Sequence, residues 1–268
     1  MDEFNTTLDF SATTLTPLLF VFILGLLVGS FLNVCIYRIP LEKTVVKGRS
    51  FCPSCEKPIP WYLNIPLLSY IFLQGRCRFC GSKISPSYPL IELLNGLLTL
   101  FCFVVYGFNP TALFAAALFS LLIVIAFIDI HHRIIPDGLV VAVTIVALLN
   151  AVHQIFFLQG SWHLYFFGIL AASLPLLILG LIYPDGMGGG DVKFMAAAGL
   201  FVGWKLILLS LFFGCLIALL YVIIQMIRRI PLKGVPIPFA PFLSAGIIIA
   251  QLWGIRIVGF YLKLVWGL

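Results

Sequence analysis

The sequence predicts an all-α polytopic membrane protein, with about eight transmembrane helices and one small extramembrane domain between the first two. Of the 268 residues, 62% are hydrophobic and only 10% are charged, against roughly 45–50% and about 25% in soluble domains. The apolar residues also form long runs without Asp, Glu, Lys or Arg. This composition excludes a soluble globular enzyme, a nucleic-acid-binding protein and a disordered chain. The net charge of +6 therefore indicates membrane topology rather than a DNA-binding surface.

The charge-free runs define the spans, because one helix needs about 20 apolar residues to cross a hydrocarbon core of ~30 Å. The second run is broken at Gly107–Pro110 and the third around His153–His163, so each gives two spans. The runs are apolar on every side, as is typical of helices embedded in lipid. We therefore expect seven full spans and one short segment from the six runs Phe10–Tyr37, Leu93–Ile128, Gly138–Pro184, Phe194–Trp204, Leu206–Ile227 and Gly234–Ile255.

The charges around the first run predict the orientation. No Lys or Arg precedes Arg38, and the N-terminal segment carries only acidic charges, so this run lacks the positive start of a cleaved signal peptide. Basic residues are abundant directly after the span. The positive-inside rule places them in the cytosol and the N-terminus outside. Arg133 and Lys193 then fall on the same cytosolic face after two and four further spans.

The short segment Phe194–Trp204 leaves two topologies open. As a helix of eleven residues it spans only about 16 Å, so it must be extended by its flanks or lie in a locally thinned bilayer. Whether this segment crosses or is re-entrant, three of the six basic residues that follow it lie on the cytosolic face and three on the outer face. We expect crossing, because the compact basic loop Arg228–Lys233 resists translocation more than isolated residues such as Lys205 do.

Residues 39–88 form the long polar stretch of the chain and contain two Cys-x-x-Cys pairs, separated by twenty-one residues. This spacing is typical of a zinc site with four thiolate ligands, and Gly81 eases the second turn. Disulfides or free thiols are the alternatives, but a cytosolic loop is kept reduced. Four protein ligands leave no open coordination position, so we predict a structural Zn²⁺. Its ligands would be Cys52, Cys55, Cys77 and Cys80.

The remainder of this polar domain offers a meagre apolar core, so the metal would supply much of its folding free energy. The other cysteines of the chain occur singly in apolar runs, and we expect them to be small buried hydrophobic residues. The core candidates are Trp61, Tyr62, Leu68, Tyr70 and Phe72, and the single cysteines are Cys35, Cys102 and Cys215.

Carboxylates are scarce near the apolar runs, and three of them have simple interpretations. Asp137 follows Pro136 and precedes a span, which favours helix capping. Asp185 lies in Tyr-Pro-Asp-Gly, a turn sequence. Glu92 lies near the entry to the second span, and it is either an interfacial acid or a functional one.

Asp129 is not explained by capping or solvation, and for Asp191 a capping role would account for the aspartate but not for the four glycines beside it. Asp129 ends an apolar run at the C-terminus of the third span, where the helix dipole and partial burial both disfavour a negative charge. Asp191 follows Gly186-Met-Gly-Gly-Gly, and such glycines allow close approach of another chain. With the predicted topology both residues reach the same membrane face, and ionisable groups there are functional candidates. The pair is either catalytic, sharing one proton, or a proton or ion relay.

Five motifs in this order resemble the type IV prepilin peptidases, which are bifunctional leader peptidases and N-methyltransferases of the bacterial inner membrane. The resemblance covers nearly the whole chain, and its last motif is similar to the Gly-x-Gly-Asp element of presenilin-like membrane proteases. The motifs are Gly29–Pro40; the two Cys-x-x-Cys pairs with Trp61, Asn64–Pro66 and Ser69–Tyr70 between them; Ser85–Glu92; Asp129–Asp137; and Gly188–Asp191.

The resemblance implies that Asp129 and Asp191 are catalytic aspartates, which cleave a short basic leader after a glycine. It implies prepilins of type IV pili or pseudopilins of type II secretion as substrates, S-adenosylmethionine as methyl donor for the new N-terminal residue, and eight spans in the inner membrane. The expected organisation is a tail and first span in residues 1–38, a zinc-binding cytosolic domain in 39–88, and a membrane-embedded peptidase core in 89–268.

The methyl-transfer activity has no recognisable soluble-type site, because no strand–Gly-x-Gly-x-x-Gly–helix unit is present. The residues that bind S-adenosylmethionine are therefore not assigned, and Glu92 and the cytosolic loop are the candidates. Two rival functions stay open on the residues alone. One is a transporter with Asp129 and Asp191 as proton carriers, although no internal repeat is evident. The other is a zinc-stabilised assembly scaffold without turnover.

Overall fold

The structure is a computed structural model that describes residues 12–46, 50–183, 187–230 and 237–266. Within these ranges the chain is almost entirely helical, and extended pairing is limited to two isolated bridges in the polar loop. The predicted all-α class is therefore confirmed. The turn expected at Asp185 and the acidic N-terminal segment lie outside the described residues.

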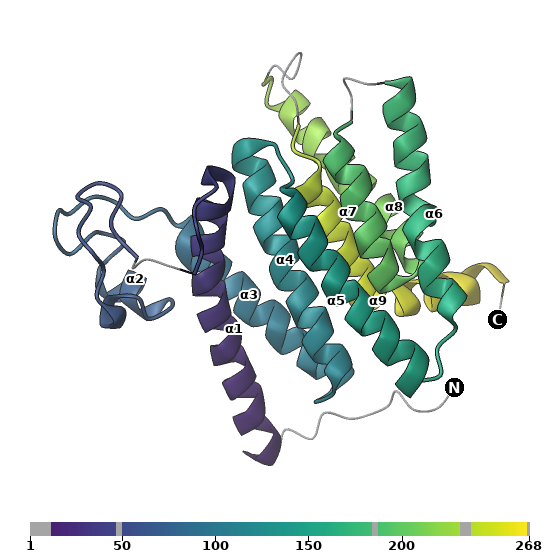
Figure 1. Cartoon of the computed structure of the whole chain (residues 1–268), viewed down its shortest axis with the longest axis horizontal. Helices are drawn as coiled ribbons and strands as arrows, with labels where there is room; N and C mark the ends of the chain where they lie inside the picture. The colour runs from purple at the N-terminus through teal and green to yellow at the C-terminus, as the bar shows by residue number, and fades with distance from the viewer. Residues whose placement is uncertain (1–11, 47–49, 184–186, 231–236, 267–268) are drawn as a thin grey trace. The chain divides into compact units, whose positions relative to one another are not determined.

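The described chain contains nine α-helices and two short 3-10 helices, which Figure 1 shows in order from the N-terminus. The 3-10 helices are Ile39–Leu41 and Trp61–Leu63. The α-helices are α1 (Ala12–Arg38), α2 (Leu68–Phe72), α3 (Ser87–Tyr106), α4 (Pro110–His132), α5 (Asp137–Phe157), α6 (Trp162–Ile182), α7 (Gly189–Val202), α8 (Trp204–Ile227) and α9 (Ala240–Trp266).

Seven helices of the described chain are long and apolar enough to span a membrane, as the charge-free runs predicted. They are α1, α3, α4, α5, α6, α8 and α9. The expected break after the second span is the α3–α4 connection, where Gly107 has a φ of +71° that favours glycine. Of the remaining helices, α2 belongs to the polar loop and α7 is the short segment.

The chain folds into two compact units. The first consists of Met1–Arg38 and Glu42–Ala116, and the second of Ile39–Leu41 and Ala117–Leu268. Within the first unit α1 packs against α3 (Figure 1). A Cβ at Gly29 would lie 2.7 Å from the Cα of Glu92, so glycine permits this close approach. The Asn95 amide also donates to the Gly25 carbonyl at 2.7 Å, which ties α3 to α1 beside Glu92.

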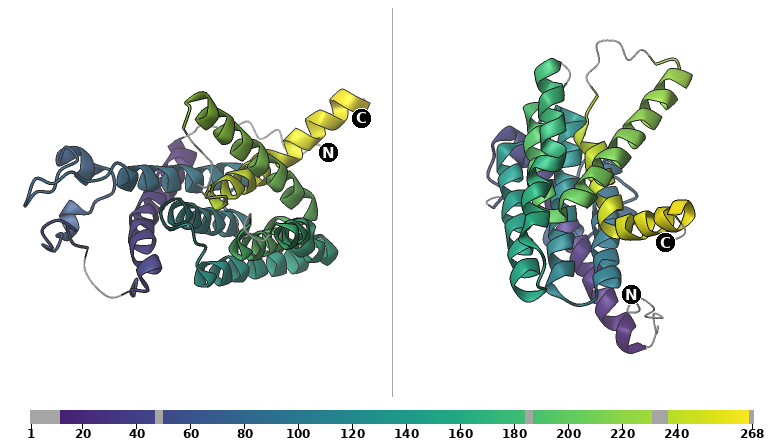
Figure 2. Two further views of the ribbon diagram at one scale, coloured as in Figure 1. Left: turned by 90° about the horizontal axis from the view of Figure 1, so that it is seen from above. Right: turned by 90° about the vertical axis from the view of Figure 1, so that its right-hand side faces the viewer.

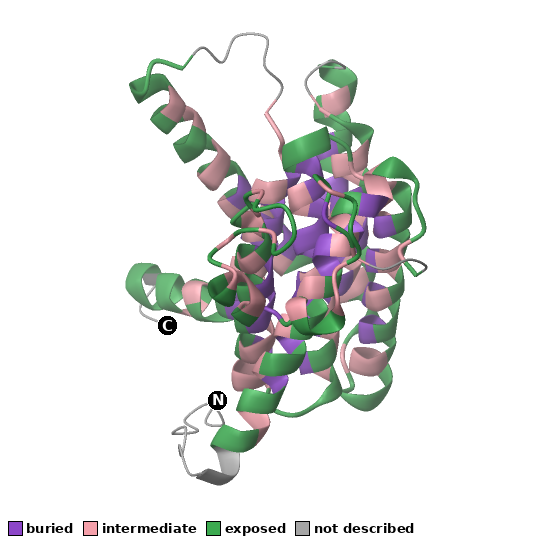
Figure 3. Cartoon of the chain, turned by 90° about the vertical axis from the view of Figure 1, so that its left-hand side faces the viewer, coloured by how far each residue is buried: buried purple, intermediate pink, exposed green. Residues whose placement is uncertain are grey.

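The polar segment between α1 and α3 has almost no apolar core, as the exposed and half-exposed colouring of Figure 3 shows. The core expected for it is wrong: the side chains of Trp61 and Phe72 are 82% and 81% exposed, and Tyr62 and Leu68 are also exposed. The reason is length, because a loop of roughly 50 residues holds too few turns to enclose large side chains. The four cysteines of the two Cys-x-x-Cys pairs lie together and organise this segment instead.

In the second unit α7 contacts α5, α6, α8 and α9, and its side chains Phe194, Met195 and Ala198 are fully buried. Gly168 of α6 and Gly199 of α7 bring the two backbones so close that a Cβ on either would overlap the carbonyl of the other. In Figure 2, α8 and α9 pack together over part of their lengths and then diverge. Neighbouring helices therefore enclose α7, which explains how a short helix is stabilised here.

The helix α7 differs from the expected segment at both ends. It begins at Gly189, five residues before Phe194, and ends at Val202. Gly203, with a φ of +79°, then separates it from α8. The charges of Asp191 and Lys193 had excluded this first turn from a charge-free run, although both residues are helical. The helix is thus extended by its N-terminal flank, and its 14 residues are about 21 Å long.

Candidate functional site

Asp129 lies in the last turn of α4, with only 7% of its surface exposed. Its Oδ2 accepts a hydrogen bond of 3.0 Å from the backbone N–H of Ala240, the first residue of α9. The N-terminus of a helix favours a negative charge. The α9 terminus therefore offsets the unfavourable position of this carboxylate at the end of its own helix.

Asp191 lies in the first turn of α7 and is half-buried. Gly188 precedes this helix in an extended conformation, and its carbonyl accepts the Asp191 N–H at 3.1 Å. The neighbouring Gly190 approaches Ile135 of the α4–α5 connection. Asp129 is near enough for its charge to act on the Asp191 carboxylate. The two aspartates, 62 residues apart in the sequence, thus lie within electrostatic range of each other in the second unit.

Two neighbouring carboxylates in a partly buried site cannot easily carry two negative charges, so such a pair tends to share one proton. The shared proton gives the pair an acid and a base at the same pH, which is the requirement for activating water against a carbonyl. The same arrangement can also pass a proton. The site is therefore competent for acid–base chemistry at this end of the second unit.

Asp137 does not cap α5, so this expectation is wrong. Pro136 occupies the N-cap position and Asp137 is the first helical residue, with no capping hydrogen bond from a side chain. Its carboxylate instead pairs with Lys193 of α7 at 2.8 Å. Both side chains are largely exposed, and exposed ion pairs contribute little to stability. This pair joins the starts of α5 and α7 on the same side as the aspartates.

The partner of Asp129 could not be named from the sequence. Ala240 has no functional side chain, and its contribution is a backbone N–H. Prolines cluster around Ala240, including Pro238 and Pro241. Proline interrupts a helix but is favoured in the first turn of one, so this cluster indicates that a helix begins here. Such a segment marks a helix N-terminus with unpaired N–H groups.

The four predicted metal ligands meet in the polar loop. The sulfur atoms of the four cysteines all lie within 4.8 Å of one another, which is suitable for holding a single metal ion. The described cysteines form no disulfide. This cluster fits a tetrahedral Zn²⁺ site with thiolate ligands. Its members are Cys52, Cys55, Cys77 and Cys80.

Each Cys-x-x-Cys pair forms a tight knuckle. The Cys52 carbonyl accepts the N–H of Glu56 at 2.8 Å, and the Cys77 carbonyl accepts that of Gly81 at 2.9 Å. Gly81 has a φ of +72°, as its role in the turn predicted, and Glu56 adopts the same left-handed conformation with a φ of +56°. The two knuckles therefore repeat one geometry.

The thiols of the cluster differ in acidity. Burial opposes ionisation of Cys52, but the backbone N–H groups of Cys55 and Ser54 outweigh it and lower the pKa of this thiol to about 6. A backbone N–H at Lys57 lowers the pKa of Cys55, but burial and the neighbouring sulfurs outweigh that effect and raise it to about 11. The negative charge of one thiolate thus opposes ionisation of the next thiol. A divalent cation would remove this repulsion, which is consistent with a metal site.

The single cysteines only partly match the expectation. Cys35 and Cys102 are buried, but Cys215 of α8 is exposed. On a helix apolar enough to span a membrane, an apolar side chain can face lipid rather than protein, which accounts for the difference.

Glu92 is buried in α3, with 9% of its surface exposed. Its Oε2 accepts the backbone N–H of Leu67 at 2.8 Å, and the Ser30 side chain also bonds to it. The carboxylate therefore joins α1, α3 and the polar loop rather than facing the interface freely.

These features define a polytopic membrane protein with a paired-carboxylate site in its helical core and a cysteine cluster between its first two spans. Residues 23–106 match the bacterial peptidase A24 N-terminal domain, and residues 116–223 match the type IV leader peptidase family. The first match contains the four cysteines and Glu92, and the second contains both aspartates. The chain belongs to the type IV leader peptidase family, which confirms the resemblance and makes it an enzyme of the peptidase class.

Several relatives are named prepilin leader peptidase/N-methyltransferase. That of Bacillus subtilis is 36% identical over 247 residues, covering 92% of this chain and 98% of the relative. That of Myxococcus xanthus is 38% identical over 201 residues, covering 73% and 59%. That of Aeromonas salmonicida is 33% identical over 276 residues, covering 91% and 93%. No solved structure matches the chain.

Proposed function

We propose that the chain cleaves the basic leader from type IV prepilins and pseudopilins with Asp129 and Asp191, and then methylates the new N-terminus. The observation that carries the proposal is the pairing of a buried Asp129 with Asp191, close enough for one charge to act on the other. The names of the relatives support the two activities.

The pair would use its one shared proton in cleavage. The ionised aspartate accepts a proton from water as the water oxygen adds to the scissile carbonyl carbon. The protonated aspartate donates to the carbonyl oxygen, and the collapse of the tetrahedral intermediate returns a proton to the leaving amine. The Ala240 N–H holds the Asp129 carboxylate in a fixed position for this exchange.

The proposed orientation puts the N-terminus outside, and the aspartates and residues 39–88 on the cytosolic side of the bacterial inner membrane. The abundance of Arg and Lys in residues 39–88 supports it through the positive-inside rule. A prepilin has a basic leader in the cytosol and an apolar helix in the bilayer. Its cleavage point would then reach the membrane surface at the level of the aspartates.

The proposed methyl donor is S-adenosylmethionine, because its sulfonium activates a methyl group for transfer to an amine. When bound, this donor would supply the methyl group for the new α-amine, and its sulfur would leave as a neutral thioether. The cysteine cluster would hold a structural Zn²⁺, which leaves no open position for chemistry.

The test is cleavage of a purified prepilin by purified protein carrying Asp129→Asn or Asp191→Asn. An amide matches the shape of a carboxylate but cannot exchange the proton, so each variant should lose roughly 100- to 10,000-fold in rate. The double variant should lose little more, because the two groups act as a unit. Both variants should still methylate a precut pilin.

Asp137→Asn is the matched control, because its carboxylate lies on the same side but forms only an exposed ion pair. It should retain most of the cleavage activity. Full cleavage by the Asp129→Asn or the Asp191→Asn variant would refute the aspartyl mechanism, and a proton-carrying role would then be favoured.

A further inference from the structure

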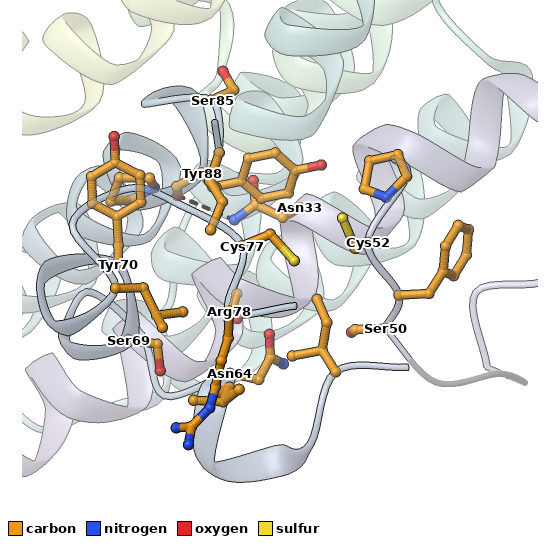
Figure 4. Close-up of a pocket in the computed structure, with 18 of the residues that line it drawn as sticks. Asn33, Ser50, Cys52, Asn64, Ser69, Tyr70, Cys77, Arg78, Ser85 and Tyr88 are labelled. Atoms are coloured by element: carbon orange, nitrogen blue, oxygen red, sulfur yellow. Dashed lines mark hydrogen bonds between the residues drawn. The ribbon is translucent and has the colours of Figure 1, made fainter. Parts of the chain in front are cut away.

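The helix α2 of the polar loop turns its apolar side chains outward. Leu68, Ile71 and Phe72 are three and four residues apart, so they share one face of the helix, and all three are exposed. Ser69 and Tyr70 lie on the other side, where they line a cavity of about 410 Å³ between the loop, α1 and α3 (Figure 4). A surface helix of a soluble protein has the opposite orientation, with its apolar stripe toward the core. This face is therefore suited to an apolar environment outside the protein.

The turn that precedes α2 extends this apolar surface. Trp61 and Tyr62 are exposed, and their rings meet edge to face with centroids 5.9 Å apart. The Ser69 hydroxyl accepts the N–H of Ile65 at 3.0 Å and so ties the turn to α2. An exposed group of this kind marks a site of interaction with a protein or a membrane. The apolar face of the loop consists of the exposed side chains of Trp61, Tyr62, Ile65, Leu68, Ile71 and Phe72.

A hydrogen bond sets the level of this face relative to the membrane. Leu67, the residue before α2, donates its N–H to the Oε2 of Glu92 at 2.8 Å. Glu92 lies in the second turn of α3, which is long and apolar enough to span a membrane. Leu67 has a φ of +59° at this point, which residues other than glycine rarely adopt. The bond therefore holds α2 at the level where α3 enters the bilayer.

Basic residues lie beside the start of the same helix. Arg76 and Lys83 are paired in an isolated antiparallel bridge, and both are exposed. Together with Ser85 and Pro86, which directly precede α3, they line an open hollow of about 450 Å³. Residues 39–88 as a whole contain seven basic and two acidic residues. The charge around the hollow is thus complementary to an anionic headgroup.

We propose that the apolar face of the loop inserts into the membrane interface, with an anionic phospholipid headgroup in the hollow between Arg76 and Lys83. Lipid is the occupant because the loop is attached to membrane-spanning helices at both ends, and the Leu67–Glu92 bond holds the face at their level. Trp and Tyr are enriched at membrane interfaces, and basic residues near the surface attract anionic lipids. The bilayer thus supplies the apolar surroundings that the loop is too short to form by itself.

The test places a photoreactive side chain on the apolar face of the full-length protein, in nanodiscs with equal amounts of a zwitterionic and an anionic phospholipid. Phe72→p-benzoylphenylalanine puts the probe at an exposed position, so the fold should be kept. Irradiation should link the probe to lipid, which mass spectrometry identifies from the mass added to the peptide. Phe79→p-benzoylphenylalanine is the matched control, because it makes the same change at an exposed phenylalanine outside the apolar face. It should form several-fold fewer lipid adducts.

The headgroup site is tested by Arg76→Gln and Lys83→Gln in the protein that carries the probe at Phe72. Each charge removed should lower the ratio of anionic to zwitterionic lipid adducts by up to about fivefold, since a basic residue near an anionic surface contributes about 1 kcal/mol. Lys57→Gln makes the same change at an exposed residue outside the hollow and should leave this ratio unchanged.

Adducts of the Phe72 probe with another segment of the chain, or with added prepilin in place of lipid, would assign the apolar face to a protein contact and overturn the proposal. A Phe72 probe that forms no adduct, or lipid labelling that is equal at Phe72 and Phe79, would overturn it as well. An adduct ratio that stays the same in both Arg76→Gln and Lys83→Gln would refute the headgroup site.

Discussion

The close approach of α6 and α7 makes Gly199→Ala a direct test of how the short helix holds Asp191. A Cβ at this position would overlap the Gly168 carbonyl, at 2.6 Å from its carbon and 3.3 Å from the Ile169 nitrogen. These neighbours are backbone atoms, so they cannot rotate aside. The two helices must move apart to accept the methyl group.

Two effects of opposite sign set the change in unfolding free energy. Alanine in a helix interior is favoured over glycine by up to about 1 kcal/mol, whereas overpacking typically costs ~1–3 kcal/mol. Because the overlap is with backbone, we expect the upper part of that range, and a net loss of about 1–2 kcal/mol. Asp191 lies eight residues along the same helix, so the displacement also reaches the carboxylate. A misplacement of about 1 Å can cost ~100-fold in rate.

The assay compares the thermal unfolding of the purified variant in detergent with its prepilin cleavage rate below the unfolding temperature. The rate should fall further than the stability loss explains. Gly259→Ala is the control, because that glycine lies within α9 and a Cβ there meets no atom within 4 Å. Wild-type stability and rate in Gly199→Ala would contradict this account of the packing, and so would equal impairment of the control.

The remaining predictions concern the metal and the topology. Metal analysis should find about one zinc per chain. Cys52→Ser and Cys77→Ser should each remove the zinc and destabilise the loop, whereas the control Cys215→Ser should do neither. A metal-free protein with a protease-resistant loop would contradict a structural role. A reporter fused after Lys233 should behave as cytosolic and one fused at Lys205 as external. The opposite result would make α7 re-entrant.

Features that depend on local composition and spacing could be predicted from the sequence. The seven long helices follow from charge-free runs, because the bilayer requires a fixed length of apolar chain. The cysteine cluster follows from two short spacings and a glycine, because ligand geometry is local.

Features that depend on tertiary contacts could not be predicted. The Asp129 carboxylate bonds to the backbone N–H of Ala240, 111 residues away; the prolines around Ala240 indicate a helix start there but do not indicate its partner. Asp137 was expected to cap its own helix, yet Lys193 offered a charged partner from another helix. The large side chains of the polar loop, such as Trp61, are exposed because nothing in so short a segment can cover them. In the first two cases the outcome was set by residues distant in sequence, and in the third by the small size of the segment itself.

Both aspartates share one electrostatic feature that accounts for their burial. Asp191 lies in the first turn of α7, and Asp129 accepts the N–H of the first residue of α9. Each carboxylate is thus placed at a helix N-terminus, where partial positive charge stabilises an anion. A single buried charge would otherwise shift to its neutral form, and two would repel. The glycine-rich start of α7 and the proline-flanked start of α9 therefore each supply a helix N-terminus to one of the two carboxylates.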